Sequence, residues 1–343
     1  MSPLANPVLP PDSTILVTGV NGLVGSHVAD QGLAHGYKIR GAVRDKAKNW
    51  WLQEHFEAKY GKGRFNLIEV KDFEGPYEDA VKGVSGVALV SFVPSNGDPN
   101  EAITRYINGL LGALKAAARE PTVKRFVLTS SAMATPPLDT ESERSLTSDD
   151  WNDEVVKQAW IPPFTAEKAF TVYGASKVQG EQALFTFVKE EEPHFQASTI
   201  VTPFVLGKRI SHKHQGHPSS IGMAVMAYHG GAGVEQMKGL PPFYFVNSED
   251  IGRFHLLALI HPDIKNERVY PWAEQVNVND FLAAYRKLFR RKDFPQDIPG
   301  LVKSKWTIEG RAKAEKWLKD LGSSGFVSFY ESMRGTAEGL DGN

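Results

Sequence analysis

The chain has no cysteine among its 343 residues, which excludes disulfide bonds, thiolate nucleophiles and cysteine-ligated metals. It also has no excess of either charge, because 39 basic and 40 acidic side chains leave a formal net charge of -1. A chain without net positive charge has no broad field to attract nucleic acid or an anionic membrane. We therefore expect a small-molecule partner, with no nucleic acid and no membrane.

Long hydrophobic runs are missing too, since no segment approaches the roughly 18 uninterrupted apolar residues that a membrane span requires. The stretch from Met1 to Asp12 is rich in proline and has no basic segment followed by an apolar run, so it does not resemble a signal peptide. The 41% hydrophobic content is enough for a full core. These features predict a cytoplasmic monomer or homodimer, built as one large domain with a smaller lobe.

Short β-branched runs alternate with segments of helical spacing through the first part of the chain. The expected strands cover residues 14–18, 37–43, 64–70, 87–92, 125–129 and 198–201. The expected helices cover about 23–34, 46–60, 77–82, 101–119, 151–159 and 166–191. Beyond Pro203 we expect irregular elements around the glycines at 230, 231 and 233, and then helices near 248–260, 277–289 and 308–321. Repeated alternation predicts an α/β fold with a parallel sheet covered on both faces.

A glycine turn, Thr18-Gly19-Val20-Asn21-Gly22-Leu23-Val24-Gly25, joins the first expected strand to the first expected helix. In this spacing Gly19 permits the tight turn, Gly22 lets the backbone approach a diphosphate, and Gly25 lets the helix pack closely on the strand. A β-branched strand before the turn and a periodic helix after it supply the context that the motif needs. The segment therefore predicts a dinucleotide-binding site.

The end of the second expected strand indicates which dinucleotide binds. A site that prefers NAD usually has a carboxylate about 20 residues after the glycines, but Gln31 through Arg44 contains no acidic residue. A guanidinium at Arg44 is suited to clamping a ribose 2'-phosphate through paired hydrogen bonds. We therefore expect NADPH/NADP+. Asp72, at the end of the third strand, either accepts from the adenine amino group or caps the following helix.

Tyr173 and Lys177 are four residues apart in Tyr173-Gly174-Ala175-Ser176-Lys177, so on a helix they lie one turn apart on the same face. An ammonium beside a phenol favours the phenolate and makes the phenol a better proton donor and acceptor. The reduction of a carbonyl group requires a proton donor of this kind, because negative charge develops on the carbonyl oxygen. The pair can also be an ordinary half-buried tyrosine with a solvated lysine.

The hydroxyls of Ser130 and Ser131 follow the expected strand 125–129, at the edge of the sheet where ligands bind in doubly wound folds. A serine at this edge can donate a hydrogen bond to a substrate oxygen as charge develops on it. Neighbouring residues at a strand end point to opposite sides, and we select Ser131 as the one that faces the ligand.

These motifs resemble those of the extended short-chain dehydrogenase/reductase family, and the resemblance runs from Thr14 to about Tyr270. The matching segments are the glycine turn, Arg44, Phe126-Val127-Leu128-Thr129-Ser130-Ser131, Tyr173-Gly174-Ala175-Ser176-Lys177 and Pro203-Phe204-Val205-Leu206-Gly207. The segment from Val123 to Ser131 is especially similar to the branch of fungal aldehyde and ketone (carbonyl) reductases, methylglyoxal reductases, and plant dihydroflavonol and cinnamoyl-CoA reductases.

The resemblance implies a Rossmann-type doubly wound parallel sheet with a smaller mixed C-terminal substrate lobe. Residues 1–202 would form the NADP(H)-binding domain and residues 203–343 mainly the lobe, with some segments returning to the sheet. It implies an NADPH-dependent carbonyl reductase in which Ser131, Tyr173 and Lys177 form a catalytic triad, and Lys177 also holds the nicotinamide ribose. The expected cofactor-binding residues are Gly19, Asn21, Gly22, Leu23, Gly25, Arg44, Lys48, Asp72, Phe73, Lys177, Pro203 and Val205.

One position departs from the family pattern. The epimerase and dehydratase branches have an asparagine three residues before the glycine that aligns with Gly109, and this chain has Tyr106 there. Asn108 is close but out of register. A proton relay through an asparagine is therefore not supported by the sequence.

The expected substrate pocket consists of apolar and aromatic residues from loops after the strands and from the lobe, which suits an apolar or aryl carbonyl compound. Its candidates are Phe92, Met133, Phe204, Leu240, Phe243 and Tyr244, although each can also simply pack the lobe against the sheet. The loop 208–218 contains three histidines whose spacing does not match a metal site, so we expect no metal. The loop is either a mobile basic flap over the cofactor or an anionic substrate, or an ordinary surface loop.

Two other functions remain open from the sequence. One is a nucleotide-sugar epimerase or dehydratase that retains NAD, which would need an NAD-type strand end and the relay asparagine. The other is a noncatalytic protein that binds a dinucleotide and senses redox state, although such proteins usually lack the tyrosine and lysine pair.

Overall fold

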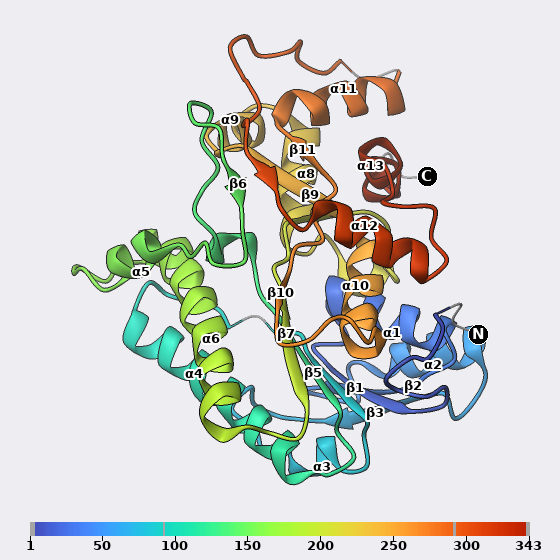
Figure 1. Ribbon diagram of the computed structural model, residues 1–343. Helices are drawn as coiled ribbons and strands as arrows, with labels where there is room; N and C mark the ends of the chain where they lie inside the picture. Colours follow the sequence, from blue (N-terminus) through green and yellow to red (C-terminus); the bar gives the residue numbers. More distant parts are fainter. Residues whose placement is uncertain (1–3, 92, 291–292, 341–343) are drawn as a thin grey trace.

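The computed structural model describes residues 4–91, 93–290 and 293–340, and a seven-stranded parallel sheet lies at its centre (Figure 1). The strands of this sheet are β1 (Thr14–Thr18), β2 (Lys38–Val43), β3 (Phe65–Glu69), β4 (Gly86–Leu89), β5 (Arg125–Thr129), β7 (Gln196–Ile200) and β10 (Arg268–Val269). Their order across the sheet is β10-β7-β5-β4-β1-β2-β3, and every pair is parallel. The order reverses between β1 and β4, where such folds open a crevice for ligands. The expected doubly wound α/β fold is confirmed.

Helices cover both faces of this sheet because alternate strand residues point to opposite sides. On β1, Val17 belongs to the hydrophobic cluster under the helices of one face, and Leu16 to the cluster under the helices of the other. The first face carries α1 (Leu23–Ala34), α2 (Trp50–Tyr60), α10 (Ser248–Ile260) and α12 (Arg311–Asp320). The second carries α3 (Glu78–Val81), α4 (Pro99–Arg119) and α6 (Ala169–Glu191). The buried runs of the strands are therefore packed on both sides.

The C-terminal lobe is built on a second, mixed sheet of three strands in the order β11-β9-β8. Its strands are β8 (Phe204–Leu206), β9 (Phe243–Asn247) and β11 (Glu274–Val276). The helices of the lobe are α7 (His212–Gln215), α8 (Ser219–His229), α9 (Ala232–Lys238), α11 (Val278–Leu288) and α13 (Phe329–Ala337). The short strands β6 (Ser145–Leu146) and β12 (Thr307–Ile308) pair with each other, and α5 (Asp153–Ala159) lies beside α6.

Several sequence-based expectations about these elements are wrong. The region after Pro203 is not irregular, because α8 and α9 form there, and the Gly230-Gly231 pair is the turn between them with φ values of 77° and 50°. The helix expected from residue 46 begins only at Trp50, since the Asp45 side chain accepts a hydrogen bond from the Lys48 backbone and forms a local turn. The C-terminal helix α13 was not expected. Across the described ranges, no helix is long and apolar enough to cross a membrane.

A buried ion pair joins α6 to the far edge of the sheet. The Arg268 Nε atom donates to Glu181 Oε2 over 2.9 Å, and the two side chains are 2% and 0% exposed. The same carboxylate accepts from the hydroxyls of Ser130 and Thr199, each over 2.6 Å. Such a pair is expensive to desolvate, and hydrogen bonds to both carboxylate oxygens are what make it tolerable. Helix α6 is thereby tied to β5, β7 and β10 at one point.

Replacing Glu181 with alanine should lower the free energy of unfolding by about 3–5 kcal/mol, because Arg268 would remain buried without its partner. Urea unfolding followed by circular dichroism measures the change. As a control, Arg334→Ala removes the exposed ion pair with Glu331 and should cost less than about 1 kcal/mol. Equal losses in the two variants would mean that the buried pair does not hold the fold together.

Candidate functional site

The glycine turn is packed so closely that larger residues do not fit. Gly19 has a φ of +56°, and a Cβ atom there would lie 2.4 Å from the carbonyl oxygen of Val90 at the end of β4. A Cβ atom on Gly25 would lie 2.3 Å from the Gly19 carbonyl oxygen. No described side chain caps the amino end of α1, so its first N–H groups are available to an anion. This cradle suits a dinucleotide diphosphate at the crevice between β1 and β4.

The charged residues expected at the cofactor site differ in their ion-pair partners. Arg44 follows β2, is exposed, and has no ion-pair partner within the described part of the chain. Lys48 is also exposed and pairs with Asp45 at 3.3 Å. The Asp72 carboxylate accepts from Arg105 Nη2 over 2.8 Å to each oxygen, and this contact holds the pKa of Asp72 below its usual range. Among these three residues, Arg44 is thus the one whose side chain has no ion pair within the described part of the chain.

The loop 208–218 lies over the glycine turn. Gln215 Nε2 donates to the carbonyl oxygens of Asn21 and Gly22 and to the Ser26 hydroxyl, over 3.2, 3.1 and 2.9 Å. The rings of His214 and Trp51 stack with centroids 4.6 Å apart and planes 5° apart. These contacts hold the loop against the glycine turn, and its role as a flap over a cofactor stays a prediction.

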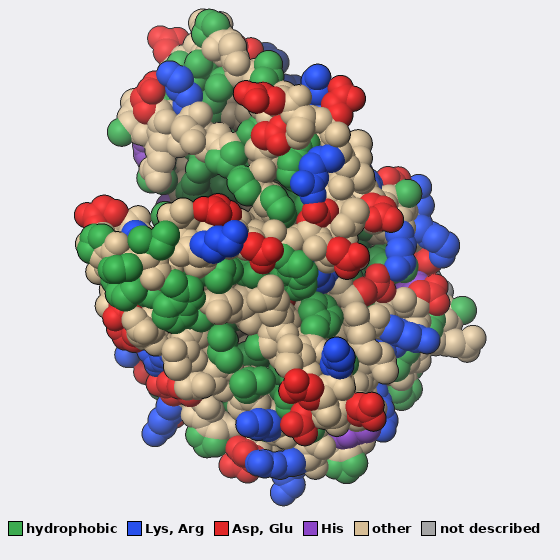
Figure 2. Space-filling model, turned by 60° about the vertical axis from the view of Figure 1, so that its left-hand side comes forward, with side chains coloured by type: hydrophobic (Ala, Val, Ile, Leu, Met, Phe, Trp, Pro, Cys, Tyr) green, Lys and Arg blue, Asp and Glu red, His purple; other side chains and the backbone are tan. Residues whose placement is uncertain are grey.

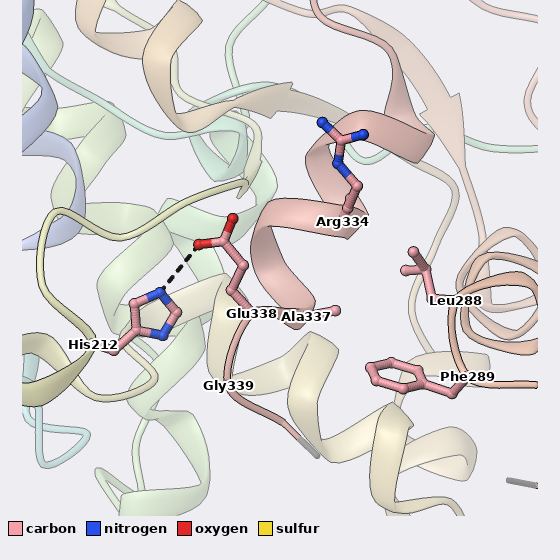
Figure 3. A pocket seen from close by; sticks show the side chains of 7 residues that line it. All are labelled: His212, Leu288, Phe289, Arg334, Ala337, Glu338 and Gly339. Atoms are coloured by element: carbon pink, nitrogen blue, oxygen red, sulfur yellow. Dashed lines mark ion pairs between the residues drawn. The ribbon is translucent and has the colours of Figure 1, made fainter. Parts of the chain in front are cut away.

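The first histidine of that loop points elsewhere, toward the end of α13 (Figure 3). His212 Nε2 lies 3.4 Å from Glu338 Oε2, and the pair borders an open cavity of about 580 Å³. The other lining residues are Leu288, Phe289, Arg334, Ala337 and Gly339. A group of three or more metal-ligating side chains is not found among the residues that the structure describes.

The remaining cofactor candidates lie in separate elements of the fold. Leu23 is buried at the start of α1, and Pro203 is buried between β7 and β8. Val205, inside β8, is buried too, and both its backbone N–H and its carbonyl bond to the Ser220 hydroxyl over 3.0 Å. Phe73 lies against α4 and stacks on the ring of Tyr106.

Ser131, Tyr173 and Lys177 come together at the carboxyl edge of the sheet. Ser131 follows β5 and caps a short 3-10 turn, η1 (Ala132–Ala134), where its hydroxyl accepts from the Met133 backbone N–H over 3.2 Å. Tyr173 is half-buried on the first turns of α6. Burial raises the pKa of the Tyr173 phenol, and a hydrogen bond from the Ser131 side chain offsets part of that rise. The phenol therefore carries its proton at neutral pH.

Lys177 is almost fully enclosed, with 2% of its surface exposed. Its Nζ atom donates to the Tyr106 hydroxyl over 2.9 Å and to the carbonyl oxygens of Ser91 and Thr129 over 3.2 and 3.3 Å. It lies 5.6 Å from the centre of the Tyr173 ring. Burial lowers the pKa of Lys177 to about 7, and the nearby Glu181 carboxylate limits the drop. The ammonium is thus held beside the phenol.

The two serines after β5 point in different directions. Ser130 is 3% exposed, and its hydroxyl donates to Glu181 Oε1, so it is part of the buried ion-pair cluster. Ser131 is half-buried and contacts Tyr173. Ser131 is thus the serine beside Tyr173, and its role of facing a ligand stays a prediction.

The expected substrate residues fall into separate groups. Met133 packs on α6, where its Cε atom would lie 3.3 Å from a Cβ atom added to Gly174. The rings of Phe204 and Phe243 are 4.9 Å apart. Leu240 and Phe243 border a cavity of about 200 Å³. Phe92 lies outside the described residues. Hydrophobic side chains also line the hollow between the small upper part and the larger lower part of the molecule (Figure 2).

Tyr244 belongs to a different cluster from the other lobe candidates. Its ring packs at 5.2 Å from that of Trp272, and its hydroxyl donates to the carbonyl oxygen of Trp306 over 3.2 Å. Trp272 donates in turn to the Val201 carbonyl over 2.7 Å. Ala132, next to Ser131, packs against this cluster. Trp272 and Trp306 were not identified from the sequence, because single tryptophans in irregular segments have no distinguishing pattern.

Three further residues next to the site were missed as well. Glu181 had a usable signal, since it lies four residues after Lys177 and thus on the same face of α6. Tyr106 was noted only as a departure from the family pattern. Arg268 had no local signal, because only the folded sheet brings β10 beside β7.

Comparison with known proteins gives consistent matches along the chain. Residues 15–273 match the NAD dependent epimerase/dehydratase family. Aldehyde reductase 2 of Sporidiobolus salmonicolor is 38% identical over 97% of this chain and 98% of its own length. Ketoreductase adrE of Penicillium rubens is 35% identical over 98% of each chain. The crystal structure of Gre2 in complex with NADPH from Candida albicans has a TM-score of 0.79 at 19% identity, covering 97% of this chain and 99% of that one.

The substitution Gly25→Ala should destabilise the protein by about 1–3 kcal/mol, because the added methyl group meets the backbone of Gly19 and the helix must shift. Gly112→Ala is the matched control, since this glycine is also helical and its Cβ would make only an ordinary contact at 3.4 Å. That control should be neutral or slightly stabilising, as alanine favours helices. Urea unfolding of both variants tests the prediction, and a neutral Gly25→Ala would contradict it.

Proposed function

The chain belongs to the NAD dependent epimerase/dehydratase family, and we propose that it is an NADPH-dependent carbonyl reductase that converts a ketone or an aldehyde to an alcohol. The observation that carries this proposal is the meeting of Ser131, Tyr173 and Lys177 at the carboxyl edge of the sheet. The glycine cradle for a dinucleotide lies at the same edge. The names of the two reductases matched along nearly their full length support the same activity.

The cofactor assignment rests on the cradle and on Arg44. The uncapped amino end of α1 fits a diphosphate, and the exposed guanidinium after β2 fits a 2'-phosphate. The bound NADPH of the Candida albicans Gre2 structure supports the same choice. Residues 1–202 would form the cofactor-binding domain, and residues 203–343 would mainly form the substrate lobe.

The proposed reaction combines a hydride and a proton. Bound NADPH supplies the hydride to the carbonyl carbon. Ser131 donates a hydrogen bond to the carbonyl oxygen, and Tyr173 transfers its phenolic proton to that oxygen as negative charge develops there. The Lys177 ammonium then stabilises the phenolate that remains, until a proton from solvent restores it. In this proposal the three side chains act together on one reduction step.

The substrate side is apolar, which favours an apolar or aryl carbonyl compound. Met133 packs on α6 beside Gly174, and the rings of Phe204 and Phe243 pack on each other in the lobe. Leu240 and Phe243 border the cavity of about 200 Å³, which is a candidate space for part of such a substrate.

The substitution Tyr173→Phe should reduce kcat for NADPH-dependent reduction by about 10²- to 10⁴-fold, because it removes the proton donor and leaves the ring in place. NADPH oxidation is measured with aryl ketones, keto esters, α-dicarbonyls and aldehydes. Tyr330→Phe, on α13, should leave the rates unchanged.

Equal rates for the wild type and Tyr173→Phe would remove the tyrosine from the mechanism. A wild-type protein that binds NADPH but reduces no carbonyl compound would favour the redox-sensing alternative. Purification with tightly bound NAD+ would favour the epimerase or dehydratase alternative.

The substitution Arg44→Ala should raise the Kd for NADPH about 10- to 100-fold while changing the Kd for NADH little, because only NADPH has the 2'-phosphate that needs the guanidinium. Isothermal titration calorimetry measures both constants. Lys71→Ala removes another exposed cation, beyond β3, and controls for a general change in charge. Similar losses for both cofactors would exclude Arg44 from the phosphate site.

A further inference from the structure

Tyr106 of α4 is in direct contact with the proposed catalytic lysine. Its phenolic oxygen accepts a hydrogen bond from Lys177 Nζ over 2.9 Å, and its ring centre lies 4.4 Å from the same atom. The side chain is 1% exposed, so water does not compete for this contact. We propose that Tyr106 is a positioning residue of the reductase, whose hydroxyl holds the Lys177 ammonium in place and in its charged form.

The Tyr106 ring is tightly packed between α4 and α6. Phe73 stacks on it with ring centroids 5.6 Å apart and planes 14° apart. On the facing helix, a Cβ atom at Gly180 would lie 2.4 Å from Tyr106 Cε1, so only glycine leaves room for the ring there. Gly109 makes the corresponding room for Phe73, because its own Cβ would lie 2.4 Å from Phe73 Cδ1. Glycine in a helix interior lowers the stability of the helix. In α4 and α6 the two glycines leave the space that the stacked rings occupy.

Each of the three protons of the Lys177 ammonium has one acceptor. Two acceptors are backbone carbonyls, of Ser91 after β4 and Thr129 on β5, and the third is the Tyr106 hydroxyl. The carbonyls cannot be removed by substitution, whereas the hydroxyl can. A substitution of Tyr106 therefore tests whether these hydrogen bonds hold the Lys177 ammonium in place.

The charge of Lys177 depends on the groups that face it. From α6 these are the Tyr173 phenol and the Glu181 carboxylate, and from α4 the Tyr106 phenol. Burial raises the pKa of Tyr106 well above its ordinary value, so its hydroxyl stays neutral. A neutral acceptor that bonds to an ammonium stabilises the charged form and raises the pKa of the lysine. Loss of the hydroxyl should therefore lower the pKa of Lys177.

This inference rests on the proposed carbonyl reduction, and Tyr106→Phe tests it because the variant keeps the ring and its stack on Phe73. We expect kcat to fall about 10-fold or more at pH 7, the KM for the carbonyl substrate to change less than about twofold, and the alkaline decline of the kcat profile to move to lower pH. The measurement is NADPH oxidation from pH 5 to 9 with a carbonyl substrate that the wild type reduces.

Tyr77→Phe is the matched control, because it removes another buried phenolic hydroxyl from the same hydrophobic cluster. The Tyr77 hydroxyl donates to the Phe73 carbonyl and does not contact Lys177. Its pH profile should match that of the wild type. Circular dichroism and NADPH titration establish that both variants fold.

The possible outcomes separate this inference from the proposed function. A shifted profile in Tyr106→Phe alone supports the positioning role. An unchanged kcat overturns it, and so does a lower kcat with an unshifted profile, which would indicate a purely structural tyrosine. A wild type that reduces no carbonyl compound would instead refute the proposed function itself.

Discussion

The buried contact between Glu181 and Arg268 is the interaction on which the arrangement of the site depends. It fixes α6 against the sheet in both position and rotation, because both carboxylate oxygens are used. Tyr173, Lys177 and Glu181 are spaced by four residues along this helix and share one face. A rotation of α6 that moved Glu181 away from its partners would also turn the phenol and the ammonium away from Ser131. The same orientation of α6 is therefore required both for the ion pair and for the proposed catalytic geometry.

The same carboxylate also affects the charge of the site. Lys177 is buried, and burial alone would favour the neutral amine. Glu181, one helical turn away, acts in the opposite direction, although its own charge is shared with Arg268. The lysine is thus left with a pKa of about 7, where small changes in its surroundings alter its protonation. The hydrogen bond that Lys177 donates to the Tyr106 hydroxyl then matters more than it would for a lysine in water.

The sequence predicted those parts of the fold that depend on local pattern. Strand β1, the glycine turn and α1 follow from a β-branched run, three glycines and a periodic segment, and the structure has them as expected. The parallel, doubly wound character of the sheet followed from the alternation of strands and helices and from resemblance to a family. The meeting of Ser131 with Tyr173 was predictable because each residue lies at a recognisable place in its element. Their catalytic roles remain proposals.

What the sequence did not reveal depends on contacts between distant segments. Strand β10 has two residues, too few for a pattern, and Arg268 becomes meaningful only when β10 pairs with β7. The helices α8 and α9 were missed because the glycines between them suggested irregular chain. Tyr106 was visible as an unusual residue, but only the packing of α4 on α6 puts its hydroxyl next to Lys177.

Arg268 also connects the lobe to the chemistry. Besides Glu181, its guanidinium donates to the carbonyl oxygens of Ser148 and Asp150 and lies 3.8 Å from the centre of the Trp151 ring. Those residues belong to the long segment that follows Ser131, and this segment includes β6, which pairs with β12 of the C-terminal region. One side chain thus joins the helix with the proposed acid, the segment after the proposed serine and a strand that returns from the lobe. Because β10 carries this arginine, the position of α6, with the proposed catalytic tyrosine and lysine, depends on the pairing of β10 with β7.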